Sequence, residues 1–398
     1  MTTDRTAIRR RLAVRRTAHR PPLGGRKASP RPASRWSAFG HRSILAPLAA
    51  TFAATVVVGI GVAVAARAER ERRAARQRLP ERERRFGLLR SETAANGLRR
   101  IALGQLDLAI ELLRGESPLA PEEAVHETRK ALKRLRALMR LLDGEIGAKR
   151  ATRERAVLRD AAGALAGARD AEVMVNTLDA LMRRRSRELG RRRGLIELRE
   201  HLRDERRTAT AQTLGDSVTR TEVAQELCAL RARVAQWQLR DRSADRLLGS
   251  GLQRIYRAGR TGHRRAGERR PGPRALHRWR KHVKDLRYAL EILDVQDPSG
   301  ARGRSSGGRR PGKRIAKLAH RADVLGELLG EEHDLMVLAE RAGSYRPLKR
   351  HRRARKQLLR AISRRRARLR KRALRQGEDL YERRPRRFVR RVRAATRA

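Results

Sequence analysis

Cysteine, aromatic residues and acidic residues are all scarce in this chain of 398 residues. The single cysteine, Cys228, excludes an intrachain disulfide framework and a Cys-x-x-Cys metal knuckle. Aromatic residues make up 3% of the chain, which leaves few platforms on which the bases of a single-stranded nucleic acid could stack. No complete Walker-type loop, with its Gly, Lys and Ser or Thr, is present. We therefore expect neither a metal ion nor a cofactor.

The shortage of acids leaves a large positive charge. The chain has 100 Lys and Arg against 43 Asp and Glu, a formal net charge of +57. Part of this surplus can reflect the Arg-rich codon usage of a GC-rich genome. A surplus of this size destabilises a compact state by self-repulsion unless anions offset it. Nucleic acid, an anionic membrane surface and inorganic polyphosphate are the candidate partners, and charge alone does not choose among them.

The first 85 residues differ from the rest. Residues 1–43 contain one acid, Asp4, and are rich in Arg, Pro, Ser and Gly, which predicts a disordered basic tail. Residues 44–66 are 23 consecutive residues without a charge, long enough to span a bilayer as a helix. Residues 67–85 alternate Arg and Glu and indicate a charged linker.

Residues 44–66 allow three interpretations. We predict a membrane anchor, and because Arg residues are denser just after this segment, the remainder of the chain is expected on the cytoplasmic side. A signal peptide cleaved near Ala65 fits the small residues there, although a 43-residue leader is long for one. The third interpretation is an apolar segment packed on protein, which would leave a cytoplasmic protein without an anchor.

From Phe86 onward, apolar residues recur at spacings of three and four, and no stretch alternates with a period of two. Gly and Pro clusters at 115–121 and 267–273 and the segments 143–144 and 297–312 interrupt this pattern. We therefore predict an all-α domain over residues 86–393. The predicted helices cover residues 86–114, 121–142, 150–183, 185–214, 220–260, 273–294, 313–343 and 347–380.

One basic pattern occurs on two of these predicted helices. His277 stands 151 positions after His126, and Leu286 stands 151 positions after Leu135. The recurring polar residues are His126, Arg129, Lys130, Lys133 and Arg136 in the first copy and His277, Arg280, Lys281, Lys284 and Arg287 in the second. Because the order and spacing are the same, an ordinary solvated basic face is a poor explanation.

Beside each basic stripe lies an apolar seam with helical spacing. The seam residues are Val125, Thr128, Leu132, Leu135, Met139 and Leu142 in the first copy and Leu276, Trp279, Val283, Leu286, Leu290 and Leu293 in the second. A second motif also recurs, with Asp334 standing 164 positions after Asp170, and the longer segment 297–312 accounts for the larger offset. These offsets predict an internal duplication, with two pseudo-symmetric helical bundles over about 86–214 and 220–393.

A row of cations at one-turn spacing suits an extended polyanion. Successive turns of a helix rise by about 5.4 Å, Arg offers forked donors to phosphate, and Lys offers a mobile point charge. We expect Asp170 and Asp334 to orient neighbouring basic side chains by ion pairing. His333 and Asp334 are adjacent, but no other His or Asp stands at metal-ligand spacing from them, so we predict no metal site.

The duplicated pattern resembles the CHAD family, the conserved histidine α-helical domain. Residues 125–142 and 276–293 look like its two signature helices, residues 168–175 and 328–338 like its paired Asp motifs, and residues 377–388 like its C-terminal segment. The resemblance implies helical bundles around a basic cavity, inorganic polyphosphate as ligand, and phosphate contacts from the ten recurring residues. In the Asp motifs Ala166 stands where the second copy has Gly330, and Arg169 stands where it has His333.

Non-catalytic binding of polyphosphate is the function that we expect. The enzyme alternative, phosphohydrolysis, lacks support because the Glu-x-Glu-x-Lys signature of tunnel triphosphatases is absent. The other alternative is a general nucleic-acid-binding basic protein, for which the net charge is the main argument. Competition between polyphosphate and DNA would separate these two hypotheses.

Overall fold

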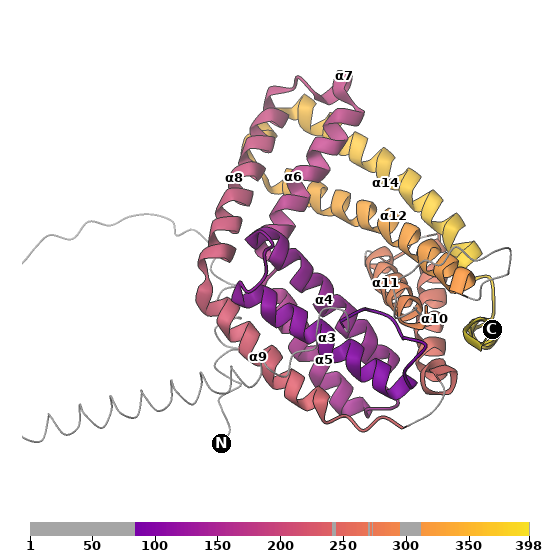
Figure 1. Ribbon diagram of the computed structural model, residues 1–398. Helices are drawn as coiled ribbons and strands as arrows, with labels where there is room; N and C mark the ends of the chain where they lie inside the picture. Colours follow the sequence, from indigo (N-terminus) through magenta and orange to yellow (C-terminus); the bar gives the residue numbers. More distant parts are fainter. Residues whose placement is uncertain (1–83, 241–243, 270, 273, 295–311, 398) are drawn as a thin grey trace, which may run out of the picture. The chain divides into compact units, whose positions relative to one another are not determined.

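The computed structural model describes residues 84–240, 244–269, 271–272, 274–294 and 312–397. All regular secondary structure in these ranges is helical, which confirms the predicted all-α fold (Figure 1). The helices are α3 (Ala94–Arg114), α4 (Pro121–Leu141), α5 (Ala148–Ala164), α6 (Gly167–Arg184), α7 (Ser186–Leu189), α8 (Arg193–Gly215), α9 (Ser217–Ala235), α10 (Ala244–Gly267), α11 (Ala275–Leu293), α12 (Gly312–Ser344), α13 (Arg346–Arg350), α14 (Arg352–Tyr381) and α15 (Pro385–Arg397).

The predicted tail at 1–43, the apolar segment at 44–66 and nearly all of the linker at 67–85 lie outside these ranges. Among the helices of the described ranges, none has the length and apolar character that crossing a bilayer requires. The membrane anchor therefore stays a prediction.

Several predicted helix boundaries are wrong, for local reasons. The helix expected at 150–183 is two helices, because Gly163 and Gly167 weaken the helix around Leu165, whose carbonyl accepts a hydrogen bond from Arg129. The segment 220–260 is likewise divided between α9 and α10, and 185–214 between α7 and α8. The helix expected from Phe86 begins at Ala94, where the Thr93 hydroxyl caps it by accepting from the Asn96 amide. Helix α15 was not predicted.

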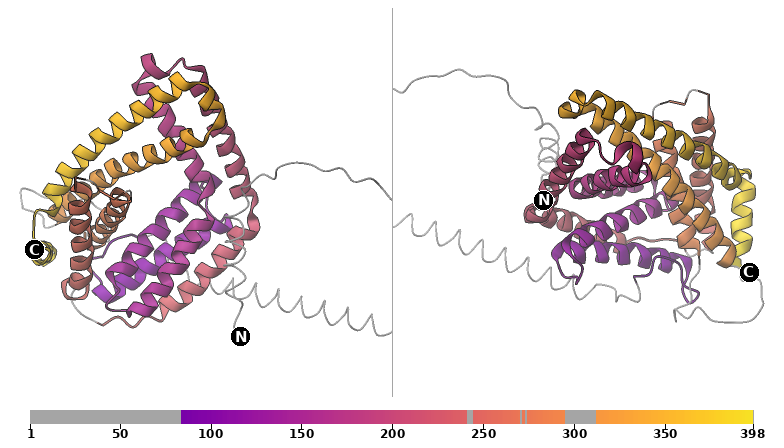
Figure 2. Two further views of the ribbon diagram at one scale, coloured as in Figure 1. Left: turned by 180° about the vertical axis from the view of Figure 1, so that it is seen from behind. Right: turned by 90° about the horizontal axis from the view of Figure 1, so that it is seen from above.

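The helices pack in two groups. In the first, α3 packs against α4 and α9, and α5 packs against α4 and α9; in the second, α11 packs against α10 and α12, and α12 packs against α14. In both views of Figure 2 α14 lies along α12. Helix α9, which the predicted boundary at residue 220 assigns to the second half, thus packs with helices of the first. The duplication itself stays a prediction.

Three further helix–helix contacts position the site. Helix α4 packs against α11 and α10, and α6 packs against α12. The approach of α10 to α4 requires a glycine, because a Cβ atom on Gly251 would lie 1.9 Å from the carbonyl oxygen of Leu141. The two basic helices are therefore held beside each other by close packing.

The apolar seams point into the core, as predicted. All six seam residues of α4 and the segment after it are buried, and Leu132, Leu135, Met139 and Leu142 have no exposed surface. In α11 the seam is buried from Trp279 to Leu293, and only Leu276 is partly exposed. Because the seam fixes the rotation of each helix about its axis, it also fixes the direction of the basic stripe beside it.

Candidate functional site

The ten recurring basic and histidine residues line one cavity. It has a volume of about 980 Å³, and its walls come from α4, α6, α11 and α12. Figure 1 labels these four helices. The predicted residues that it brings together are His126, Arg129, Lys130, Lys133 and Arg136 from α4 and His277, Arg280, Lys281, Lys284 and Arg287 from α11. Two stripes that are 151 positions apart in the sequence therefore face the same space.

Three of these cations are paired with acids of the protein. Arg129 donates to Asp170 at 3.2 Å and to the carbonyl of Leu165 at 2.7 Å, so it ties α4 to the start of α6. Lys130 pairs with Glu127 at 3.0 Å on the same helix. Arg287 pairs with Asp323 on α12 and with Glu291, the latter at 2.6 Å. Arg129 and Arg287 therefore connect neighbouring walls of the cavity.

The other five cations have no such partner. Their side chains form no hydrogen bond or ion pair with another residue of the part that the structure describes. They are Lys133, Arg136, Arg280, Lys281 and Lys284. The Nε atom of Arg280 is buried without a hydrogen-bond acceptor, a costly arrangement for a charged donor. Five unneutralised cations in one concave space are a site for an anion.

The pKa values of the lysines report this accumulation of charge. The Lys133 side chain is accessible to solvent, but the cavity walls remove part of the water that would solvate its charge. This desolvation, together with the positive charges of Lys284 and Arg129, lowers the pKa of Lys133 to about 8. Burial and then Arg280 lower the pKa of Lys284, and burial and then Arg136 lower that of Lys281. A bound anion would reverse these shifts.

The histidines lie at the ends of the stripes. The rings of His277 and His333 are 4.4 Å apart, and burial followed by His277 lowers the pKa of His333 to about 4. Burial also lowers the pKa of His277, and its Nδ1 atom is buried without a partner. Burial and then Arg169 lower the pKa of His126. At neutral pH the three rings are neutral, and each has one N–H that could donate to a phosphate oxygen.

Acids also line the cavity, but three of them are neutralised by the protein. Asp170 pairs with Arg129, Asp285 with Arg140, and Glu331 with both Arg184 and Arg365. The ion pair of Asp170 agrees with the predicted orienting role. Asp334 has no ion pair within the described ranges, although its charge acts on Lys284. Across those ranges there is no group of three His, Cys, Asp or Glu that could hold a metal ion.

The sequence interpretation missed the contribution of α6. Arg169 lines the cavity, and its charge acts on both His126 and Lys133, which lie on α4. Arg184, at the other end of α6, reaches Glu331 on α12. The only signal was that Arg169 precedes the motif residue Asp170. No local sequence pattern indicates that α6 forms one wall of the cavity.

A protein-family model and two solved structures are similar to this chain. Residues 102–295 match the CHAD domain family. The solved structure of PptA from Streptomyces chartreusis is similar with a TM-score of 0.50 and 16% identity, over 73% of this chain and 100% of that one. The CHAD domain from the plant Ricinus communis has a TM-score of 0.44 and 21% identity, over 80% of this chain and 97% of that one. No curated protein matches the chain.

Proposed function

Residues 102–295 of this chain belong to the CHAD domain family, and from that premise we propose that the cavity between α4 and α11 binds inorganic polyphosphate. The observation that carries the proposal is the convergence of two basic stripes, with five cations unpaired within the described ranges, on one cavity. Lys133 and Arg136 are three residues apart on α4, and so are Lys281 and Lys284 on α11. Each step is close to one helical turn, about 5.4 Å, so successive cations can hold successive stretches of a linear anion.

Polyphosphate fits the lining better than a nucleic acid does. The cavity has one aromatic residue, the buried Tyr288, so it offers no platform for stacking bases. Its unpaired donors are the lysine, arginine and histidine groups that bind phosphate oxygens. We propose binding without hydrolysis, because the lysine, arginine and histidine side chains of the lining can contact phosphate oxygens. The sequence also lacks the Glu-x-Glu-x-Lys signature of tunnel triphosphatases.

Displacement of labelled polyphosphate from the full chain tests the proposal. We expect unlabelled polyphosphate to displace it, and duplex DNA at the same phosphate concentration to leave it bound, with fluorescence anisotropy as the measurement. Electrophoresis of the recovered polyphosphate should show unchanged chain lengths. If DNA displaces the labelled chain as effectively as polyphosphate does, the cavity is not a polyphosphate site. Shortened chains would instead indicate an enzyme.

The pKa of Lys133 predicts a loss of affinity in alkaline solution. In the empty cavity the pKa of Lys133 is about 8, and a phosphate chain beside Lys133 raises it. The contribution of the charged Lys133 to the binding free energy is therefore complete below pH 8 and is lost as the pH rises above 8. Raising the pH from 7 to 9 should therefore increase the Kd by about tenfold, since each pH unit beyond the free pKa changes a proton-linked constant by up to tenfold. Binding titrations at both pH values measure this ratio.

Lys133→Arg is the matched control, because a guanidinium stays charged at both pH values. The pH dependence should be smaller in this variant, with the remainder arising from Lys281 and Lys284, whose pKa values are also lowered. An equally steep dependence in Lys133→Arg would assign the titration to another group.

We also propose that residues 44–66 anchor the chain in a membrane with the helical domain on the cytoplasmic side. The uncharged run of 23 residues supports this proposal. Recovery of the full chain in the soluble fraction after cell lysis would contradict it.

A further inference from the structure

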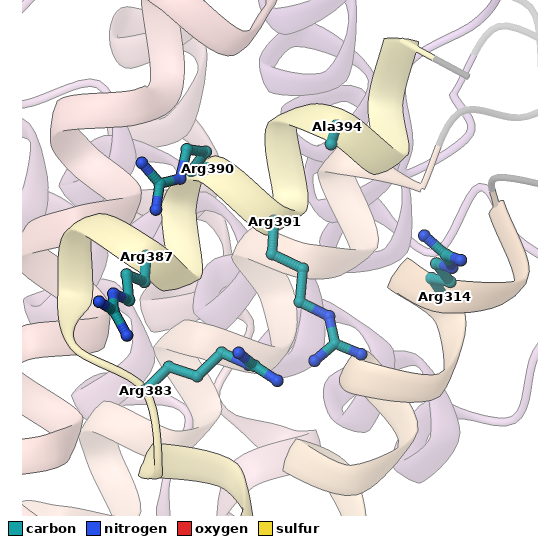
Figure 3. A pocket seen from close by; sticks show the side chains of 6 residues that line it. All are labelled: Arg314, Arg383, Arg387, Arg390, Arg391 and Ala394. Atoms are coloured by element: carbon teal, nitrogen blue, oxygen red, sulfur yellow. The ribbon is translucent and has the colours of Figure 1, made fainter.

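Helix α15 forms a ridge between two hollows that are lined by arginine. The first hollow is shown in Figure 3 and is lined by Arg314 at the start of α12, by Arg383, and by Arg387, Arg390, Arg391 and Ala394 of α15. The second is lined by Gln253, Arg257 and Arg260 of α10 and by Arg384, Pro385, Arg386, Arg387 and Arg390. Because Arg387 and Arg390 belong to both, the two hollows adjoin at α15.

No acidic side chain lines either hollow among the residues that the structure describes. Elsewhere the arginines of this fold are commonly paired with acids, as Arg199 is with Asp179 and Arg365 with Glu331. By contrast, Arg387, Arg390 and Arg391 form no ion pair within the described ranges. One surface therefore gathers arginines from α10, α12, α15 and the turn before α15, although their charges repel one another. Such a concentration of positive charge is expected of a surface that binds a polyanion.

The packing of α15 shows which of its faces is available. Phe388, Val389 and Val392 are buried, and Phe388 stacks on Tyr256 of α10 with ring centroids 3.9 Å apart. The apolar face is thus used within the fold and cannot insert into a membrane. Arg386, Arg390 and Arg391 are exposed on the opposite side. In Figure 3 Arg383 and Arg391 extend toward the same space on one flank of α15, with Arg314 across the hollow from them.

We propose that α15 enters the major groove of double-stranded DNA, with one phosphate backbone in each arginine-lined hollow. An α-helix with its side chains is about 10–12 Å across, and the major groove of B-form DNA is about 12 Å wide, so the exposed side of one helix can lie between two phosphate rows. Each row would be held from α15 and from an opposing wall, formed by Arg314 on one flank and by Arg257 and Arg260 on the other.

Other phosphate polymers use this surface less completely. A single strand or a polyphosphate chain presents one row of phosphates, whereas a duplex presents two rows, one for each hollow. A single strand would also need aromatic side chains on which its bases could stack, but Tyr256, Tyr381 and Phe388 beside α15 are buried. The pairing of two hollows across one helix therefore favours the duplex.

This surface is separate from the polyphosphate cavity. The two hollows share no lining residue with the cavity. Along α12, Arg314 lies ten residues before Val324, the first residue of that helix in the cavity wall, which corresponds to about 15 Å at 1.5 Å per residue. The proposal therefore does not depend on what the cavity binds.

The test compares two full-chain variants that lose the same charge. The first is Arg387→Gln, Arg390→Gln and Arg391→Gln on the ridge; the control is Arg353→Gln, Arg364→Gln and Arg368→Gln, which are exposed on α14 and line none of the three spaces. The measurement is the slope of log K against log salt for a short DNA duplex. Losing three phosphate contacts should reduce the slope by about 2 to 3, and the control should reduce it by less than 1.

The same variants are also titrated with a duplex RNA, as a second comparison. The major groove of A-form RNA is deep and narrow, so α15 cannot enter it, and the ridge substitutions should change the slope for RNA much less than for DNA. Short polyphosphate should bind the ridge variant with unchanged affinity. Equal slopes for the ridge and control variants, or equal effects on DNA and RNA, would overturn groove binding. Loss of polyphosphate binding with unchanged DNA binding would show that the ridge instead extends the polyphosphate site.

Discussion

Replacing Lys133, Arg280 and Lys284 together by Met is expected to raise the Kd for polyphosphate at least about 100-fold. The three residues face the cavity from both basic helices and have no ion-pair partner in the described part of the chain, so their loss removes contacts to the ligand without breaking an ion pair of the protein. A hydrogen bond to a charged group contributes about 1.5–3 kcal/mol. Even a partial loss of three such contacts therefore raises the Kd by more than about 100-fold. A binding titration at fixed salt measures the change.

The same variant should be more stable than the parent when no ligand is present. Removing three like charges relieves the desolvation and the repulsion that together lower the pKa values of Lys133 and Lys284, and Met is a good helix former. The matched control replaces Arg353, Arg364 and Arg368 by Met, an equal loss of charge outside the cavity. Wild-type affinity in a folded cavity variant, or an equal loss in the control, would place the binding site elsewhere.

Trp279→Ala is expected to cost about 3–5 kcal/mol of unfolding free energy, the usual range for truncating a buried Trp. Trp279 has no exposed surface and lies on the seam of α11. Its ring fits because two neighbours are glycines: a Cβ atom on Gly377 would lie 2.6 Å from the ring, and one on Gly262 would lie 3.0 Å from it. For a domain of this size the melting temperature should fall by roughly 10 °C. Chemical denaturation and calorimetry measure the two quantities.

Trp279→Phe should cost less than Trp279→Ala because most of the apolar ring remains. Gly377→Ala gives an independent check, since its added methyl group collides with both Trp279 and His263 and should cost about 1–3 kcal/mol. In the Trp279→Ala background the same substitution should cost less, and a double-mutant cycle measures this coupling. Additive effects would show that the two residues are not in contact.

The helical fold and the rotation of the two basic helices could be predicted because they depend on local spacing. The seam from Val125 to Leu142 is buried as its spacing predicts, so the basic residues beside it point away from the core. Helix ends were less predictable. The break at Leu165 lies between Gly163 and Gly167, and the carbonyl that it frees accepts a hydrogen bond from Arg129, 36 positions earlier; a local pattern carries no information about such a partner.

The seams also show where two similar stretches diverge. Thr128 and Trp279 occupy the same seam position, and both are fully buried. The Thr128 hydroxyl is buried without a partner, whereas Trp279 fills space left by Gly262 on α10 and Gly377 on α14. Glycines that are distant in the sequence make room for the larger side chain of Trp279, so the repeat alone could not predict how this side chain packs.

The sequence by itself determined that this protein is helical, strongly basic and marked by two stripes of the same cations. Only the tertiary structure decided that the stripes face one cavity and which cations are neutralised, because the acids come from distant elements. Asp170 lies 41 positions from Arg129, and Asp285 lies 145 positions from Arg140. It also decided that arginines of α10, α12 and α15 share a surface without acids. Charge along a chain follows from composition, whereas charge in a site depends on which side chains the packing brings together.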